Sequence, residues 1–279
     1  MTSDEPAAPG GGTAAGVGPL PFDTSVAHQA RVYDYLLGGK DNYASDRAAA
    51  EAYLEIDPDL TFSARANRAF LGRAVRYLVA EAGIRQFLDI GTGLPTAQNT
   101  HQVAQQVAPE SRVVYVDNDP IVLAHARALL TSAPEGARDY IDADLRDTDK
   151  VLGRAAETLD FGQPVAVMVL CTMQYVPDAD DPRAIIARLM SAVPSGSFLA
   201  MSDTTRDIDT EVMTTGAERY NARLGSAIFT PRTGAEYIRF FDQLSLVEPG
   251  LVPMPQWRPD PGSGAAEIIP MYAAVGRKP

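Results

Sequence analysis

Cysteine, tryptophan and histidine are scarce in this sequence, which contains one, one and three of them, respectively. Because the single cysteine, Cys171, cannot form an intrachain disulfide, we expect the protein to work in the reducing cytoplasm. These few residues show no zinc-site spacing, and the sequence has no EF-hand loop and no serine nucleophile elbow. We therefore expect no metal site.

Long apolar runs and an excess of basic residues are also missing. The longest apolar run, residues 165–171, is far too short to span a bilayer, and the first residues lack the basic and apolar regions of a signal peptide. The sequence has 24 Lys and Arg against 36 Asp and Glu, a net charge of −12. Because nucleic acids and anionic membranes bind basic surfaces, we expect neither as a partner.

The 279 residues, 46% of them hydrophobic, suit one large domain with an appendage. Residues 1–21 are rich in Gly, Ala and Pro, and we expect a disordered tail there. Residues 22–82 have helical patterns and are expected to form an N-terminal helical appendage. Residues 83–279 alternate strand-like and helix-like patterns, which is typical of a doubly wound, mostly parallel α/β sheet.

The most informative stretch is FLDIGTGLPT, residues 87–96. A buried strand is expected to end at Asp89, and a Gly91-Thr92-Gly93-Leu94 turn and a helix starting at Thr96 follow. Glycine permits a tight turn and a close approach of a ligand to the backbone. At the carboxyl end of a strand in such a sheet, this turn predicts a nucleotide-like ligand.

The same stretch helps to distinguish two candidate ligands. The dinucleotide fingerprint requires a third glycine where this sequence has Thr96, after Pro95. An acidic residue such as Asp89 is unfavourable beside a pyrophosphate but suits a cation. S-adenosylmethionine (SAM) carries an ammonium and a sulfonium and no phosphate, so the stretch favours SAM over NAD.

Polar residues also follow the next strands. Asp117 and Asn118 end a second strand, where a carboxylate can accept hydrogen bonds from ribose hydroxyls; helix capping is the simpler alternative. Asp144 follows a third strand, where it can accept a hydrogen bond from an adenine amino group, and Leu145 can pack on the ring. Cys171 ends a fourth, central strand and is expected to face the reacting centre. It has no evident partner base for a role as nucleophile, and buried packing is the favoured alternative.

The segment from residue 22 to 54 mixes tyrosines with charges of both signs around Gly38 and Gly39. One interpretation is a pair of amphipathic helices with solvated charges. The other is a lid over the substrate, because aromatic and charged residues are not sorted onto separate faces. For the second interpretation, the candidate bases or acceptor-orienting groups are His28, Tyr33, Asp41 and, after the fourth strand, Tyr175.

Other elements are less specific. A helix over residues 62–82 is expected to bury Phe70 and its apolar neighbours and to expose Asn67 with several arginines. His101 is expected on a helix surface. Two β-rich runs, residues 244–252 and 267–275, predict an antiparallel C-terminal hairpin at the sheet edge.

Taken together, these residues resemble an actinobacterial S-adenosyl methyltransferase family, formerly a domain of unknown function, within the class I SAM-dependent methyltransferases. The matching stretches begin near residue 26 and reach the C-terminal part; they are VAHQARVYDYLLGGKDNYASDR, RANRAFLGRAVRYL, IRQFLDIGTGLPT, VVYVDNDPIVLAHARALL, ADLRD and FFDQLSLVEPGLVPMPQWRPD. The resemblance implies a Rossmann-like sheet of seven strands, SAM binding and an undetermined methyl acceptor. It assigns Asp89, Gly91 and Gly93 to the first SAM motif, Asp117 to the ribose, and Asp144 with Leu145 to the adenine.

We therefore expect a cytoplasmic SAM-dependent methyltransferase that acts on a small molecule. Such a transfer depends mostly on positioning, so no catalytic triad is required. Two alternatives remain at this point. One is a SAM-binding regulatory protein without turnover, and the other is an NAD-dependent oxidoreductase.

Overall fold

The structure is a computed structural model that describes residues 23–129, 136–222, 228–262 and 267–279. The tail expected over residues 1–21 lies outside this part of the chain. Within it, no helix has the length and apolar character needed to cross a membrane. The same residues contain no group of His, Cys, Asp and Glu that could hold a metal ion.

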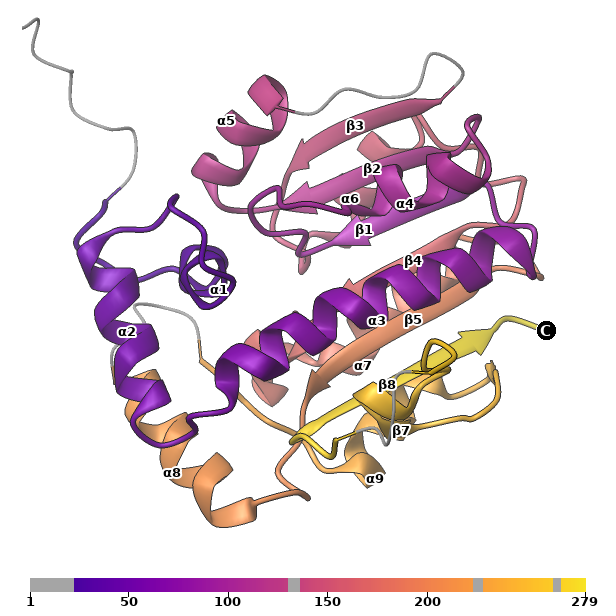
Figure 1. Cartoon of the computed structure of the whole chain (residues 1–279). Coiled ribbons are helices and arrows are strands. Elements are labelled where there is room, and N and C mark those ends of the chain that lie inside the picture. Colours follow the sequence, from indigo (N-terminus) through magenta and orange to yellow (C-terminus); the bar gives the residue numbers. More distant parts are fainter. Residues whose placement is uncertain (1–22, 130–135, 223–227, 263–266) are drawn as a thin grey trace, which may run out of the picture.

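A mostly parallel sheet forms the centre of the molecule, as predicted (Figure 1). Its strand order is β3-β2-β1-β4-β5-β8-β6, and β7 also pairs with β8. The first five strands are parallel, and β8 is antiparallel to β5. The strands are β1 (Gln86–Ile90), β2 (Arg112–Asp117), β3 (Ala137–Asp142), β4 (Ala166–Leu170), β5 (Phe198–Thr204), β6 (Ser245–Leu246), β7 (Val252–Pro253) and β8 (Met271–Arg277).

The C-terminal strands differ in detail from the predicted hairpin. The second run forms β8, which pairs with β5 along its whole length. The first run forms only the two short strands β6 and β7, both paired with β8. A turn interrupts it, because Pro249 has no N–H to donate and Gly250 adopts a positive φ of 86°. Since β5 occupies one side of β8, β6 and β7 share the other side as a seventh strand position.

Helices cover both faces of the sheet, which explains why the central strand β4 is apolar throughout. On one face lie α3 (Leu60–Ala80) and α4 (Thr100–Val107); on the other lie α6 (Thr148–Ala155) and α7 (Pro182–Ser191). The other α-helices are α1 (Gln29–Leu36), α2 (Ala44–Leu54), α5 (Pro120–Leu129), α8 (Thr210–Asn221) and α9 (Gly234–Tyr237). Short 3₁₀ helices are η1 (Met173–Tyr175), η2 (Asp178–Asp180), η3 (Ile238–Phe241) and η4 (Met254–Gln256).

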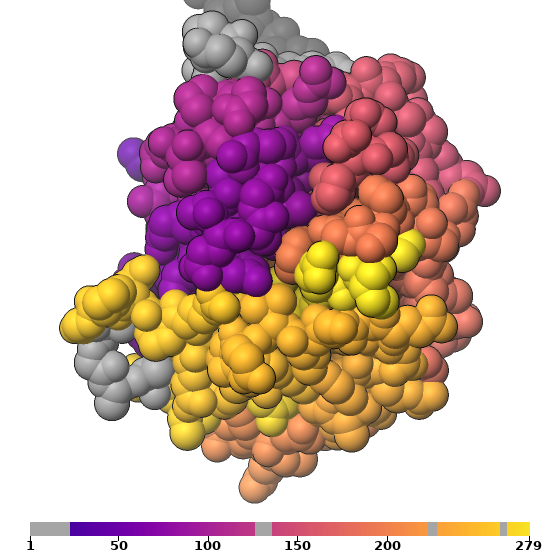
Figure 2. Space-filling view, turned by 90° about the vertical axis from the view of Figure 1, so that its right-hand side faces the viewer, coloured from indigo at the N-terminus to yellow at the C-terminus, as the bar shows by residue number. Residues whose placement is uncertain are grey.

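The helix α3 joins the N-terminal part of the chain to the sheet. Phe70 and the apolar residues spaced along the same side are buried, as predicted. Phe70 packs edge-on against Trp257, and the Arg73 Nε donates to the Trp257 carbonyl over 2.9 Å. Figure 2 shows the surface on this side, where the C-terminal segment in yellow lies against α3 in violet.

Helices α1, α2 and α8 lie together beyond the carboxyl ends of the strands (Figure 1). Helix α1 ends at Leu36, and Gly38 follows with a φ of 80°, the conformation that a glycine C-cap requires. A separate buried cluster joins the three helices; it contains Val32, Leu36, Tyr53, Met213, Tyr220 and Phe229. The N-terminal helices therefore lie over the end of the sheet where ligands bind in this architecture.

Three predictions about α3 and α4 are wrong. The helix expected from Thr96 begins at Thr100, because Asn99 forms a capping box with Gln102. His101 is buried, and its ring Nδ1 lies 2.7 Å from the Tyr115 hydroxyl. Asn67 is also buried, and its side chain hydrogen-bonds Tyr33 of α1 and Ser202 of β5.

Candidate active site

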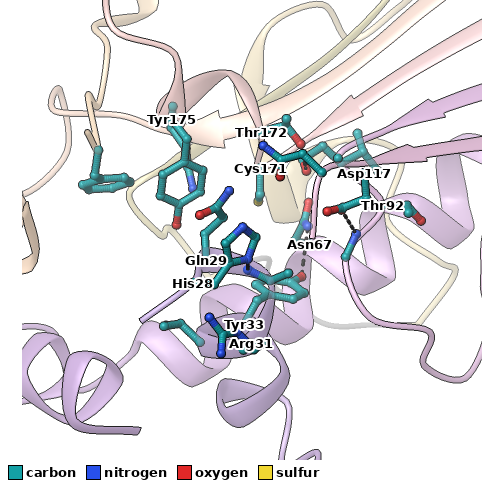
Figure 3. A pocket seen from close by; sticks show the side chains of 18 of the residues that line it. His28, Gln29, Arg31, Tyr33, Asn67, Thr92, Asp117, Cys171, Thr172 and Tyr175 are labelled. Carbon is teal, nitrogen blue, oxygen red and sulfur yellow. Dashed lines mark hydrogen bonds between the residues drawn. The ribbon is translucent and has the colours of Figure 1, made fainter. Parts of the chain in front are cut away.

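A cavity of about 440 Å³ opens at the carboxyl ends of β1, β2 and β4, beneath α1. Its volume falls within the range of roughly 300–1,000 Å³ that is common for small-molecule sites. The lining combines residues of the strand ends with residues of α1, α3 and η1 (Figure 3). The candidate site is therefore shared between the sheet and the N-terminal helices.

The turn after β1 forms one wall of the cavity. Gly91 and Gly93 have positive φ values of 71° and 66°, which favour glycine. A Cβ at Gly91 would overlap the Thr172 side chain, so this turn also needs glycine for its close contact with the segment that follows β4. Gly91, Thr92 and Gly93, three of the expected cofactor-binding residues, line the cavity, whereas Leu94 packs in a small core with Ala30 and is not part of the lining.

Asp89 lies buried below this turn and also lines the cavity. The Thr100 hydroxyl donates a 2.6 Å hydrogen bond to the Asp89 Oδ2. Burial raises the pKa of Asp89 to about 6, although the Thr100 hydrogen bond and the Arg68 charge act in the opposite direction. Burial disfavours the ionised form of this carboxylate, and a cationic ligand beside it would stabilise that form. The site therefore favours binding of a cation.

Asp117 lies buried at the end of β2, opposite the glycine turn. Its Oδ2 accepts a hydrogen bond of 2.8 Å from the Gly93 amide, and its Oδ1 accepts one of 2.9 Å from the Asp119 amide. Burial raises the pKa of Asp117, and these two hydrogen bonds oppose the shift. Because a carboxylate oxygen can accept more than one hydrogen bond, both oxygens retain capacity for ribose hydroxyls.

The ends of β2 and β3 supply the next part of the lining. Asp144 and Leu145, the expected adenine-binding residues, line the cavity, and so does Asn118, whose side chain hydrogen-bonds Asp144. Hydrogen bonds from Arg146 hold the pKa of the Asp144 carboxyl below its usual range. Arg146 also lines the cavity; its charge was visible in the sequence, but its pairing with both Asp144 and Asp180 was not.

Cys171 lines the cavity at the end of β4. It adopts a positive φ of 52°, which is uncommon for a residue with a side chain and marks the sharp exit of the chain from this strand. Burial raises the pKa of the Cys171 thiol well above its usual range, and its Sγ lies 4.0 Å from the Ser202 Oγ. The group is therefore a neutral thiol, and a role as nucleophile is disfavoured.

An ionic cluster holds α1 over the end of β2. The His28 Nδ1 lies 2.9 Å from the Asp119 Oδ2, and the Arg31 Nε lies 3.5 Å from the same oxygen. On the other side of Arg31, its Nε lies 3.6 Å from the buried Asp46, which also accepts a hydrogen bond from the His28 amide. Asp119 caps α5 through the Ile121 amide, as a capping residue should, but its second role was not predictable from local sequence.

Three of the four acceptor-site candidates line the same cavity: His28, Tyr33 and Tyr175 (Figure 3). Asp41 is the exception and corrects our prediction. Its side chain is exposed and lies outside the cavity lining, 3.6 Å from the His125 Nδ1, because its backbone amide is tied to Asp34 in the loop after α1.

A chain of hydrogen bonds fixes Tyr33 inside the cavity. The Tyr33 hydroxyl donates to the Ala64 carbonyl over 2.9 Å and accepts from the Asn67 Nδ2 over 3.0 Å. The Asn67 Oδ1 in turn accepts a 2.6 Å hydrogen bond from Ser202 at the end region of β5. Sequence reasoning missed Asn67, because a helical polar residue between arginines carries no signal of burial.

Further lining residues were also missed. Gln29 and Thr172 are neighbours of predicted residues, and their proximity along the chain was the available signal. Tyr53, Tyr220 and Phe229 come from distant segments, and nothing in the local sequence indicated that they meet here.

The strand order and the placement of Asp89, Asp117 and Asp144 at three strand ends define a class I SAM-dependent methyltransferase. The chain belongs to the S-adenosyl methyltransferase family, whose sequence profile it matches over residues 17–279. SAM is therefore the methyl donor, and the predicted enzyme class, cofactor and fold are confirmed.

Solved structures agree with this assignment. A DUF574 family protein from Streptomyces avermitilis is 48% identical and superimposes with a TM-score of 0.88, covering 92% of this chain and 99% of that one. A protein from Thermobifida fusca is 41% identical with a TM-score of 0.85, covering 94% and 99%. The plantazolicin methyltransferase BpumL, solved with S-adenosylhomocysteine, shares only the fold, at 11% identity and a TM-score of 0.53, covering 90% and 96%. No curated protein matches the chain.

Proposed function

We propose that this methyltransferase transfers the methyl group of SAM to a small molecule bound in the same cavity. The observation that carries the proposal is the continuity of that cavity. One part is lined by the glycine turn and the acids of the strand ends, and another by Tyr33, Tyr175 and further uncharged side chains. A donor and an acceptor can therefore meet without crossing a wall of protein.

The residues at the strand ends fit SAM. The glycine turn lines the cavity without side chains at Gly91 and Gly93, and the buried Asp89 favours a cation. We assign the ammonium group to Asp89 and Thr92, the ribose to Asp117, and the adenine to Asp144 and Leu145. Bound SAM supplies a methyl group on a positively charged sulfur, which an acceptor displaces directly.

His28 is our candidate for the group that accepts the acceptor's proton. Its Nδ1 lies 2.9 Å from the Asp119 Oδ2, to which it donates if protonated. If unprotonated, it accepts a 3.3 Å hydrogen bond from the Ala30 amide. The shorter contact, to a carboxylate, favours a proton on Nδ1, which leaves Nε2 as the basic nitrogen. Tyr33 and Tyr175 then orient the acceptor, and α1 closes the site as a lid.

The two alternatives are less well supported. The missing third glycine and the buried Asp89 disfavour the pyrophosphate of NAD. A regulatory protein without turnover would share every cofactor contact. The continuation of the cavity beyond Cys171 favours an acceptor site and therefore turnover.

Calorimetric titration with SAM, S-adenosylhomocysteine and NAD tests the assignment. We expect both SAM and its product to bind and NAD not to bind. Asp117→Asn should weaken the binding of both by about ten- to hundredfold, because charge-assisted hydrogen bonds to the ribose are lost. Asp142→Asn is the matched control, since Asp142 ends β3 beside Asp117 in register but is exposed and outside the cavity lining. Binding of NAD without binding of SAM would overturn the assignment.

A further inference from the structure

The part of the cavity away from the strand-end acids has an unusual concentration of aromatic rings. We call it the aromatic chamber and define it by Tyr33, Tyr53, Tyr175, Tyr220 and Phe229, all of which line the cavity. The rings come from α1, α2, η1, α8 and the segment after α8. Five separate segments of the chain thus deliver aromatic side chains to one place.

The rings support one another, so the chamber has a defined shape. Tyr53 stacks on Tyr220 with ring centroids 5.4 Å apart, and Phe229 meets Tyr220 edge-on at 5.7 Å. Phe229 also contacts Tyr175, with centroids 5.8 Å apart. Rings in contact at these distances present faces and edges that suit a further flat ring.

Among the described residues, the chamber carries no charge. Its rings are accompanied in the cavity lining by uncharged residues such as Leu36, Leu60, Ala64 and Thr204. Burial raises the pKa of Tyr175 to about 12 and raises those of Tyr33, Tyr53 and Tyr220 as well, so these hydroxyls remain protonated at neutral pH. A buried charged ligand needs a group of opposite charge beside it, and the five residues that define the chamber offer none. The charged residues of the cavity lining, such as Arg31, Arg68 and Asp89, are outside this set.

We propose that the methyl acceptor is an uncharged aromatic small molecule with a hydroxyl group, and that its ring packs in the aromatic chamber. This inference rests on the proposed function and adds the class of substrate. The hydroxyl would lie toward His28, whose ring lies between Tyr33 and Tyr175 in the view of Figure 3.

The reaction that follows balances without a further reactant. The hydroxyl proton passes to the Nε2 of His28, and an oxygen lone pair forms the new bond to the methyl carbon. The bond between that carbon and sulfur breaks, and its electron pair stays on sulfur, which becomes the neutral thioether of S-adenosylhomocysteine. The product is an aryl methyl ether.

Binding of matched probes to the protein saturated with S-adenosylhomocysteine tests the substrate class without requiring turnover. The four probes are 2-naphthol, decahydro-2-naphthol, 2-naphthoate and 2-naphthylmethylammonium. We expect 2-naphthol to bind about five- to tenfold more tightly than its saturated analogue, because ring contacts are lost in the latter. The anion and the cation should bind more weakly than 2-naphthol, because neither finds a counter-charge.

Substitutions then locate the binding site. Phe229→Leu keeps an apolar side chain but removes a ring, and should reduce 2-naphthol affinity by about five- to tenfold while leaving S-adenosylhomocysteine binding unchanged. Phe62→Leu is the control, since Phe62 is exposed on α3 and does not line the cavity. If Phe229→Leu does not fold, Tyr175→Leu provides the same test at a half-buried ring.

The outcomes separate this inference from the proposed function. Three results would overturn the aromatic substrate class. They are tight binding of the ammonium probe, equal affinities for 2-naphthol and decahydro-2-naphthol, and no binding of 2-naphthol to the protein loaded with S-adenosylhomocysteine. Unchanged 2-naphthol affinity in Phe229→Leu would place the ligand outside the chamber and also overturn it. Failure of S-adenosylhomocysteine itself to bind would instead contradict the proposed function.

Discussion

Asp89 and Asp117 are buried carboxylates near the ends of neighbouring strands, and each accepts hydrogen bonds from neutral groups. Asp89 accepts from the Thr100 hydroxyl, and Asp117 accepts from the Gly93 and Asp119 amides. Burial raises the pKa of both. A cationic ligand compensates such carboxylates, which agrees with a donor that carries an ammonium and a sulfonium.

The pKa of about 6 for Asp89 predicts a pH dependence of ligand binding. The ammonium of S-adenosylhomocysteine should bind the ionised carboxylate, so protonation of Asp89 below its pKa competes with binding. Affinity should therefore rise by up to about tenfold per pH unit below pH 6 and level off above about pH 7. Calorimetry across pH 5–8 measures this rise.

Asp89→Asn should give a flatter pH profile and weaker binding at pH 8. Comparing this variant with the wild type separates the effect of Asp89 from that of Asp117. Asp117 also has a raised pKa, and its charge acts on Asp89. A wild-type affinity that stays constant or increases toward pH 5 would show that Asp89 does not face the ammonium.

Asp203 predicts a second pH effect, on stability. It is buried at the end region of β5, its Oδ1 accepts a hydrogen bond from the Gln174 amide, and burial raises its pKa to about 8. Between about pH 4 and pH 8 the folded protein keeps this proton and the unfolded chain loses it. The free energy of unfolding should therefore decrease as pH rises, by up to about 1.4 kcal/mol per unit, until the folded pKa is passed.

Asp203→Asn should remove that contribution, since the amide stays neutral at every pH. Urea unfolding at pH 5 and pH 8.5 should show the variant gaining stability relative to the wild type at the higher pH. An identical pH dependence in both proteins would mean that Asp203 is ionised in the folded state.

At the scale of elements, the aromatic chamber depends on the close approach of α8 to α2. Tyr53 on α2 is buried against Tyr220 on α8, and Gly216 lies beside the Tyr53 ring. A Cβ at Gly216 would overlap that ring, so no other residue fits without a shift of the ring or of one helix. The chamber wall and the packing of these two helices are thus set by the same contact.

Gly216→Ala should destabilise the protein by roughly 1–3 kcal/mol through overpacking, despite the better helix propensity of alanine. Gly153→Ala is the matched control, because Gly153 lies in α6 and a Cβ there meets nothing within 4 Å. The control should be neutral or stabilising by about 0.5–1 kcal/mol. Denaturant unfolding measures the change in the free energy of unfolding for both variants. Equal changes would contradict the close packing of α8 on Tyr53.

For the whole molecule, the sequence was informative wherever a feature depends on nearby residues. Apolar runs that end in Asp89, Asp117 and Cys171 predicted parallel strands with their functional ends together. Burial of Asn67 and His101 was not predictable, because each depends on partners from distant segments. The pairing of His28 with Asp119 and the contacts among the rings of the aromatic chamber were not predictable either, because they also join distant segments.

A crystal structure of the full chain with S-adenosylhomocysteine tests the central claim, that one cavity holds the methyl donor at the strand ends and the acceptor beneath α1. We predict the ribose hydroxyls within hydrogen-bonding distance of Asp117, the adenine beside Asp144 and Leu145, and the sulfur facing the aromatic chamber. An adenosyl group bound inside the aromatic chamber, or bound outside the cavity, would contradict the account.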